Sequence, residues 1–189
     1  EKMREYELEV ILDEVVPKRP NVYGFLRGTR GNPTLMYNGH TDVVPPGDGW
    51  TVDPYGGLLK TDRLYGRGSV DMKGSVASMI IAAKALKDTH VDLKGTLMIA
   101  AVIGEEENQI GTRRLVDTGT KADFAVIGEP TRLDVCTAHK GCVAYEVMTT
   151  GRAAHASVLH EGVNAIYKMT KVIGGIEKFA EELEKRRIH

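Results

Sequence analysis

The chain has 189 residues, with 25 Lys and Arg against 26 Asp and Glu, so its net charge at pH 7 is -1. This balance gives no electrostatic argument for a nucleic-acid or anionic-membrane partner. With 42% hydrophobic and 27% charged residues, the composition is that of a globular chain and excludes disordered, collagen-like and mucin-like proteins.

Cysteine usage and apolar run length narrow the class of protein further. Cys136 and Cys142 are too few for a disulfide scaffold and lack C-x-x-C spacing. The longest apolar runs, at 79–83 and 97–104, are far shorter than the ~20 residues of a membrane span, and the charged N-terminus is unlike a signal peptide. We therefore expect a cytoplasmic protein with neither a membrane nor a nucleic-acid partner.

Short apolar segments alternate with helical patterns, which predicts an α/β fold with a mostly parallel sheet and flanking helices. The expected strands lie at residues 21–26, 34–38, 95–103 and 122–127. The last two are continuous apolar runs, typical of strands buried on both faces. Apolar residues at three- and four-residue steps predict a helix over 72–86, and a short helix is expected over 108–118.

The pattern changes after Pro130. Residues 133–150 alternate apolar and polar side chains, which predicts extended antiparallel strands. Residues 163–183 then mark a long amphipathic helix that ends in a charged run over 181–187. We place a domain change near residue 140, with one domain over 1–140 and a smaller α+β domain beginning over 141–189.

Several acidic residues and one histidine lie at the ends of four predicted strands or helices. They are His40, Asp42, Asp71, Glu105, Glu106 and Glu129. Ligands bind outside the carboxyl ends of the strands in an open α/β sheet. We therefore expect these side chains to gather at one edge of the sheet.

Carboxylates that converge without basic partners repel one another, and their pKa values rise. A multivalent cation would supply the missing positive charge. One imidazole among several carboxylates favours zinc, with cobalt or manganese as substitutes, over calcium or magnesium. A carboxylate that bridges two metals ~3.5–4 Å apart would let both act on one water and one substrate oxygen.

Each of these residues alone has a simpler interpretation. A single acid after a strand is more often a helix N-cap or a solvated loop residue, and His40 alone would be a structural histidine. Their occurrence at four element ends favours the metal site. The chain also lacks G-x-x-x-x-G-K-[ST], G-x-S-x-G and H-E-x-x-H, and Gly66-Arg67-Gly68 is followed by Asp71 where a dinucleotide-binding motif requires glycine.

Several motifs, in order over residues 22–166, resemble a family of dinuclear zinc metallohydrolases: acetylornithine deacetylase, succinyl-diaminopimelate desuccinylase, aminoacylase and glutamate carboxypeptidase. The motifs are Gly39-His40-Thr41-Asp42, Leu64-Tyr65-Gly66-Arg67-Gly68, Asp71-Met72-Lys73-Gly74, Gly104-Glu105-Glu106-Glu107, Gly128-Glu129-Pro130, His139-Lys140-Gly141 and Gly151-Arg152-Ala153-Ala154-His155. The resemblance implies a zinc-peptidase-like catalytic domain, incomplete over 1–140, and the start of a lid and dimerisation domain over 141–189.

The resemblance also implies a ligand set for two Zn²⁺ ions per complete subunit. Asp71 would bridge the two metals, His40 and Glu129 would complete one site, and Glu106 would serve the other. The family has a cis peptide after the bridging aspartate, which would fall at Asp71-Met72.

Three catalytic roles follow from the same resemblance. Glu105 would be the general base for a metal-activated water. Asp42 would not bind the metal itself but would orient the His40 ring. His155, in the lid, would reach the active site of the partner subunit in a homodimer and donate a hydrogen bond to the oxyanion.

The chain departs from the family in one respect. Family members take a last metal ligand, a histidine, from a segment beyond the lid. His139 and His155 belong to other motifs, His160 lies in the lid and His189 is terminal. We therefore expect the Glu106 metal site to be incomplete and the last strands of both domains to be absent.

The expected function is a zinc-dependent amidohydrolase that cleaves the amide bond of an N-acyl amino acid, of the acetylornithine deacetylase or succinyl-diaminopimelate desuccinylase type. The motif His139-Lys140-Gly141 slightly favours the deacetylase. One alternative is a dipeptidase or carboxypeptidase of the same family, acting on short peptides. Another is an inactive truncated module that binds one metal or dimerises. A purely structural domain would require the acidic cluster to be coincidental.

Overall fold

A computed structural model describes residues 1–186 of the chain. Two units can be distinguished, Glu1–Cys136 and Thr137–His189, and each is considered by itself. Two residues of the sequence predictions, Arg187 at the end of the charged run and the terminal His189, lie outside the described residues.

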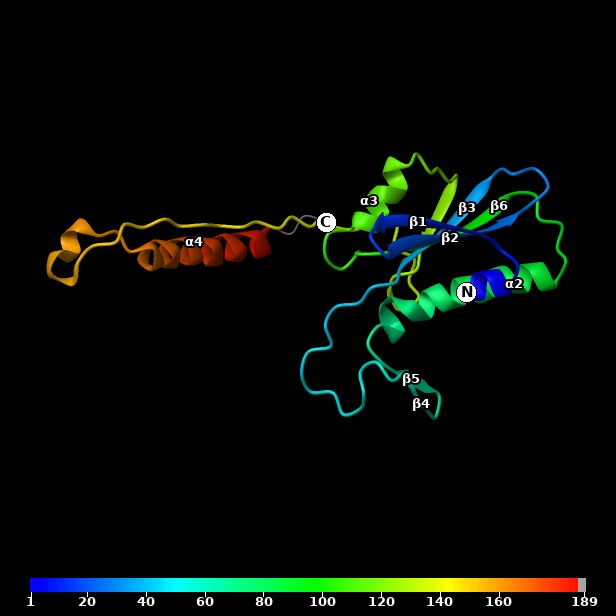
Figure 1. The fold of residues 1–189 in the computed structure, drawn as a ribbon, viewed down its shortest axis with the longest axis horizontal. Coiled ribbons are helices and arrows are strands. Elements are labelled where there is room, and N and C mark those ends of the chain that lie inside the picture. Colours follow the sequence, from blue (N-terminus) through cyan, green and yellow to red (C-terminus); the bar gives the residue numbers. More distant parts are fainter. Residues whose placement is uncertain (187–189) are drawn as a thin grey trace. The chain divides into compact units, whose positions relative to one another are not determined.

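The first unit is built on a five-stranded sheet with the order β1-β2-β6-β3-β7 (Figure 1). Its strands are β1 (Glu9–Val16), β2 (Arg19–Arg27), β3 (Thr34–His40), β6 (Thr96–Val102) and β7 (Phe124–Ile127). Strands β6, β3 and β7 run parallel, whereas β1 and β2 add antiparallel strands on one side. The predicted α/β fold with parallel central strands is confirmed, and β1 is a strand that sequence reasoning missed.

Alternate residues of β6 build two cores, because successive side chains of a strand point to opposite faces. Leu97, Ile99 and Ala101 pack with Ala83 of helix α2 (Gly74–Asp88). On the other face, the core of Met98, Ala100 and Val102 includes Leu115 of helix α3 (Ile110–Asp117). The two helices thus cover opposite faces of the sheet (Figure 1). The short helix α1 (Lys2–Glu5) adds Met3 to the α2 side.

The two apolar runs predicted to be buried on both faces behave differently. Every residue of β6 is buried, as predicted. For β7 the prediction is wrong, because all four of its residues are exposed, with Phe124 at 63% and Ile127 at 54%. Strand β7 is the last in the sheet and pairs only with β3 among the described residues, so one side of it has no neighbour.

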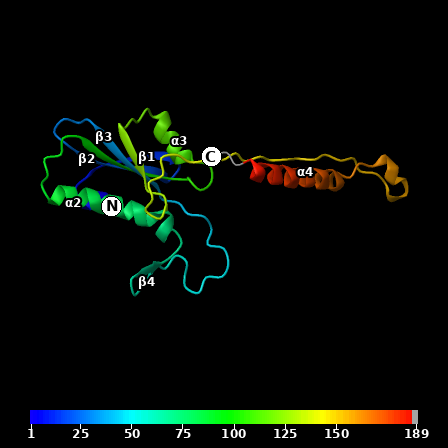
Figure 2. The ribbon, with the colours of Figure 1, turned by 180° about the vertical axis from the view of Figure 1, so that it is seen from behind.

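The segment before α2 departs from a regular helix. The turn η1 (Ser69–Lys73) contains Asp71 and Met72 with non-helical backbone angles, so the helix begins at Gly74 and not at Met72 as predicted. The peptide bond between Asp71 and Met72 is cis, as the family resemblance implied. A small hairpin of β4 (Leu58–Lys60) and β5 (Arg63–Tyr65), not predicted from sequence, precedes this turn (Figure 2).

The predicted antiparallel strands over 133–150 are wrong, since the structure contains no ladder there. Leu133, Val135 and Tyr145 are 101%, 92% and 84% exposed. Alternation of apolar and polar residues favours a strand only where a neighbouring strand takes up the backbone N–H and C=O groups. No such neighbour occurs among residues 1–186 for this segment.

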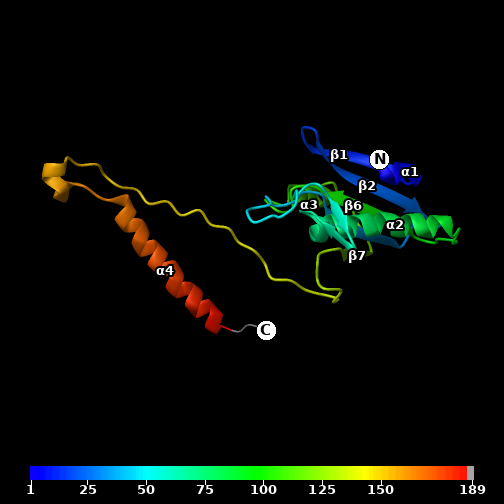
Figure 3. The ribbon, with the colours of Figure 1, turned by 90° about the horizontal axis from the view of Figure 1, so that it is seen from below.

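The second unit contains the turn η2 (Ala156–Glu161) and the long helix α4 (Ala165–Lys185), seen in Figure 3. The predicted helix over 163–183 is confirmed. It begins where Asn164 Oδ1 accepts the backbone N–H groups of Ile166 and Tyr167 at 2.8 and 3.2 Å, a standard N-cap. Of the described helices, none has both the length and the apolar character needed to span a membrane.

Candidate metal centre

His40 is the last residue of β3 and its side chain is 1% exposed. Its backbone N–H donates to Sδ of Met72 at 3.2 Å, and its Nδ1 lies 2.9 Å from the backbone carbonyl oxygen of Asp42. A carbonyl can only accept, so Nδ1 carries the proton and donates it to Asp42. This contact orients the ring so that Nε2 faces the acidic residues, the arrangement found for histidines that bind metals through Nε2.

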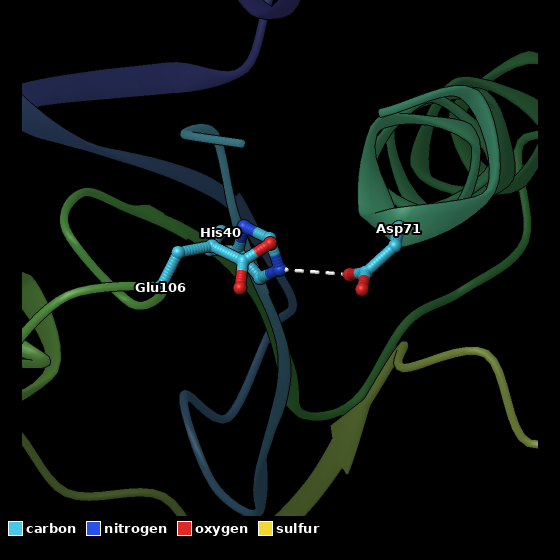
Figure 4. Close-up of side chains that lie close together, drawn as sticks. All are labelled: His40, Asp71 and Glu106. Carbon is cyan, nitrogen blue, oxygen red and sulfur yellow. Dashed lines mark hydrogen bonds and ion pairs between the residues drawn. The ribbon is translucent and has the colours of Figure 1, made fainter. Parts of the chain in front are cut away.

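Nε2 of His40 lies 3.0 Å from Oδ1 of Asp71 (Figure 4). It also lies 3.8 Å from Oε1 of Glu129 and 4.0 Å from Oε2 of Glu105. These carboxylates come from the turn before α2, the segment after β7 and the segment after β6. The predicted meeting of four element ends at one edge of the sheet is therefore what the structure contains.

Two groups of side chains have the spacing of metal ligands. One consists of His40, Asp71 and Glu106, and the other of His40, Glu105 and Glu129, with the donor atoms of each group within 4.8 Å of one another. The family resemblance divides the ligands differently, because it pairs Glu129 with His40 and Asp71 and treats Glu105 as a base. The roles of the individual residues stay predictions.

The cluster carries more negative than positive charge. Within residues 1–186, no Lys or Arg lies within 4.0 Å of the carboxylates of Asp71, Glu105, Glu106 and Glu129. Burial raises the pKa of Glu129, and the neighbouring charges of Asp71 and Glu105 raise it further, against a lowering by His40. A divalent cation would relieve this repulsion, and one imidazole with several carboxylates is a donor set that suits zinc. The residues present therefore fit a metal site.

The negative charge of the cluster also raises the pKa of the His40 ring. Burial lowers the pKa of His40, but the Asp42 carbonyl, the Asp71 carboxylate and the negative charges of Glu129 and Asp42 together raise it above its ordinary value. The negative potential that favours a proton on this ring would also favour a cation, which would bind the neutral ring in place of that proton.

Asp42 contacts the cluster in two ways. Its carboxylate accepts the backbone N–H of Glu105 on Oδ1 at 3.2 Å and that of Glu106 on Oδ2 at 3.1 Å. Burial raises the pKa of Asp42, but these two amide donors outweigh it and leave the pKa below its usual value. The carboxylate lies 3.7 Å from Nδ1 of His40, so the Asp42 carbonyl orients the ring while its side chain holds the loop of the two glutamates.

Two buried side chains make contacts that the sequence did not predict. Met72 is fully buried and accepts the His40 amide, and a Cβ on Gly39 would lie 2.6 Å from its Cε. Asn21, the third residue of β2, is also fully buried. Its signal in the sequence is a single amide side chain between Pro20 and Val22, in a segment that otherwise reads as an ordinary strand.

His155 belongs to the second unit. It is the N-cap of η2, where its Nδ1 accepts the backbone N–H of Ser157 at 3.2 Å and lies 2.8 Å from Oγ of Ser157. The ring is exposed. These contacts explain its local conformation, and its role toward a partner subunit stays a prediction.

Comparison with known proteins connects this geometry to a family. The family model described as "Peptidase family M20/M25/M40" matches residues 36–185. A probable succinyl-diaminopimelate desuccinylase of Staphylococcus aureus (strain MRSA252) is 40% identical over 156 residues, which cover 80% of this chain. The acetylornithine deacetylase of Salmonella paratyphi B (strain ATCC BAA-1250 / SPB7) is 39% identical over 175 residues, which cover 90% of this chain.

A solved structure is also similar to this chain. The crystal structure of human carnosine dipeptidase 1 is similar with a TM-score of 0.54 and 28% sequence identity, over 67% of this chain and 30% of that one. The matches cover 38% of the desuccinylase and 45% of the deacetylase. The chain thus spans less than half of the length of these curated relatives.

Proposed function

The chain belongs to the peptidase family M20/M25/M40, and on this basis we propose that it supplies the metal-binding residues of an enzyme that hydrolyses the amide bond of an N-acyl amino acid. Proteins of this family are metal-dependent. The observation that carries the proposal is Nε2 of the buried His40, which lies within 4.0 Å of three carboxylates that have no Lys or Arg partner in the described part of the chain.

In this proposal His40, Asp71, Glu106 and Glu129 hold two divalent ions, with Asp71 between them. Zn²⁺ is the expected metal, with Co²⁺ or Mn²⁺ as substitutes. When bound, such ions lower the pKa of a water molecule and polarise the carbonyl of the scissile amide. The ligand set is supported by the short distances among these side chains.

Glu105 is the residue proposed to move the proton. Its side chain is 35% exposed and one of its oxygens lies 4.0 Å from Nε2 of His40, so it borders the metal site while water and substrate can still reach it. As general base it would take a proton from the attacking water and return it to the departing amine. Asp42 supports it by accepting its backbone N–H at 3.2 Å.

The substrate class is supported by the curated relatives, which are named as a desuccinylase and a deacetylase of amino acids at 40% and 39% identity. The second candidate is cleavage of short peptides, which the similarity to a dipeptidase structure favours. A cytoplasmic location, and a homodimer formed through a lid that begins in 141–189, belong to the same proposal.

A substrate panel tests this proposal. The protein, loaded with Zn²⁺ or Co²⁺, is assayed on N-acetyl and N-succinyl amino acids and on dipeptides. We expect faster hydrolysis of the N-acyl amino acids. Faster hydrolysis of dipeptides would favour the peptidase, and metal binding with no turnover of either class would favour a non-catalytic module.

A further inference from the structure

Asn21 makes three hydrogen bonds from the interior of the first unit, where its side chain is 0% exposed. Its Oδ1 accepts the backbone N–H of Ile103 at 3.1 Å. Its Nδ2 donates to the carbonyl oxygen of Gly111 and to the hydroxyl of Tyr23, both at 2.8 Å. A buried amide whose oxygen and both N–H groups are used in this way has one fixed orientation.

The two backbone groups that Asn21 contacts are the ends of one loop. Ile103 follows β6 and Gly111 is the second residue of α3. The loop between them, residues 104–110, carries Glu105 and Glu106. The backbone N–H of Gly111 also donates to the carbonyl oxygen of Ile103 at 3.0 Å, so the two ends are joined to each other as well as to Asn21.

The two loop ends and Asn21 are packed closely around Gly111. A Cβ on Gly111 would lie 2.4 Å from the carbonyl oxygen of Ile103 and 2.6 Å from Oδ1 of Asn21. Inside the loop, the backbone N–H of Gln109 donates to the carbonyl oxygen of Gly104 at 2.7 Å. A short closed loop with fixed ends has few alternative conformations.

We propose that Asn21 is a positioning residue that fixes the two ends of the loop 104–110 and thereby sets where Glu105 and Glu106 lie at the metal centre. This rests on the proposed function, since it treats those two glutamates as the base and a metal ligand. Asp42 holds the same two residues through their backbone N–H groups. One residue therefore holds the ends of the loop, and another holds the two glutamates within it.

The network continues from Asn21 toward the surface. The hydroxyl of Tyr23 receives the Asn21 amide and donates to Oδ2 of Asp13 at 3.3 Å. Arg114 of α3 donates to both carboxylate oxygens of Asp13, at 2.9–3.1 Å. Helix α3, which begins where the loop ends, is thus attached to β1 and β2 through the same chain of hydrogen bonds.

The test compares amide hydrogen exchange in the unmodified chain, in Asn21→Leu and in Thr96→Val. Thr96 is a matched control because it is also buried and donates to a backbone carbonyl, that of Gly31, at the opposite end of β6. In Asn21→Leu we expect the Glu105 and Glu106 amides to exchange about tenfold faster or more, because two buried backbone groups lose their partner. Thr96→Val should leave these two amides unchanged.

Metal binding provides the second readout. Asn21→Leu should weaken Co²⁺ binding roughly tenfold or more, as is usual when a residue that supports metal ligands is removed, and should change the Co²⁺ absorption spectrum, whereas Thr96→Val should do neither. Unchanged exchange at Glu105 and Glu106 together with an unchanged Co²⁺ spectrum in Asn21→Leu would overturn the proposal. If the unmodified chain bound no Co²⁺, the proposed function would fail while the exchange result still decided the role of Asn21.

If Asn21→Leu does not fold, a measurement on the unmodified chain still tests the proposal. Its Ile103 amide should exchange as slowly as those of Met98 and Ala100 in the centre of β6. Exchange of Ile103 at the rate of exposed loop amides would show that Asn21 does not hold the loop, and would overturn the proposal.

Discussion

The carboxylate of Asp42 accepts the backbone N–H of Glu106 at 3.1 Å, although 64 positions separate the two residues in the chain. Two acidic side chains would repel each other, but here one of them binds the main chain of the other. The contact links the end of β3 to the segment after β6. The loop that carries both candidate glutamates therefore depends on the strand that carries His40.

Asp42→Ala removes the acceptor of both amides, so we expect the loop of Glu105 and Glu106 to loosen. Zinc affinity should fall about 10–100-fold, the usual effect of removing a residue that supports metal ligands. Titration calorimetry measures this, with Asp48→Ala, in the exposed loop, as the control. Equal affinities in the two variants would mean that Asp42 does not support the site.

Glu105→Gln keeps the size of the side chain and removes its ability to accept a proton. We expect the variant to retain its metal and to lose about 10²–10⁴-fold in turnover, the usual contribution of a general base. The matched control is Glu107→Gln, two positions away and exposed. Full activity in Glu105→Gln would refute the assignment.

Gly111→Ala places a methyl group against the backbone of Ile103 and the side chain of Asn21. We expect it to lower the free energy of unfolding by about 1–3 kcal/mol, because a packed site cannot accommodate the added carbon. Gly174→Ala in α4 meets no atom within 4 Å and should instead stabilise its helix by ~0.5–1 kcal/mol. Urea unfolding followed by circular dichroism measures both, and a neutral Gly111→Ala would show that the loop ends can separate.

The ion pair between Asp13 and Arg114 gives a prediction about pH. Hydrogen bonds from Arg114 hold the pKa of Asp13 below its ordinary value, against the effect of burial. A lowered pKa in the folded state stabilises the protein above the unfolded-state pKa of about 3.9 and is lost as the pH falls through the folded value. Arg114→Leu should therefore lower the urea midpoint at pH 7, and the difference from the unmodified chain should shrink below about pH 4.

The control for this prediction is Arg113→Leu, at the exposed neighbouring position, which has no ion pair within residues 1–186. It should leave the urea midpoint nearly unchanged at both pH values. A difference between Arg114→Leu and the unmodified chain that stayed constant from pH 7 to pH 3 would contradict the role given to Asp13.

The parallel core and the family could be predicted because their signals are local. The run at 95–103 and the periodic apolar residues at 72–86 each lie within one segment, and the motif at 39–42 is contiguous. The α/β fold and the family resemblance are confirmed. In contrast, β1 (Glu9–Val16) carries five exposed or half-buried apolar residues among acids, so its pairing with β2 decides its structure and periodicity does not.

The wrong predictions for residues 122–127 and 133–150 also concern segments whose structure depends on their neighbours. The exposure of Phe124 and Ile127 in β7, and the missing ladder over 133–150, depend on which neighbours a segment has, and hydrophobicity does not report this. The candidate ligands were found because they stand at the ends of predicted strands or, for Asp71, just before a predicted helix. Asn21 and the Asp42–Glu106 contact were missed because they join segments far apart in sequence, by hydrogen bonds that no motif records.

Calorimetric titration of Zn²⁺ into the chain shows directly whether His40 and the surrounding carboxylates form a metal centre. We expect the unmodified chain to bind at least one Zn²⁺ and Asp71→Asn to bind it about 100-fold more weakly or worse, since Asp71 is the nearest carboxylate to Nε2 of His40. Asp48→Asn should bind as the unmodified chain does. Absence of zinc binding, or equal affinity in Asp71→Asn and the unmodified chain, would contradict a metal centre at His40.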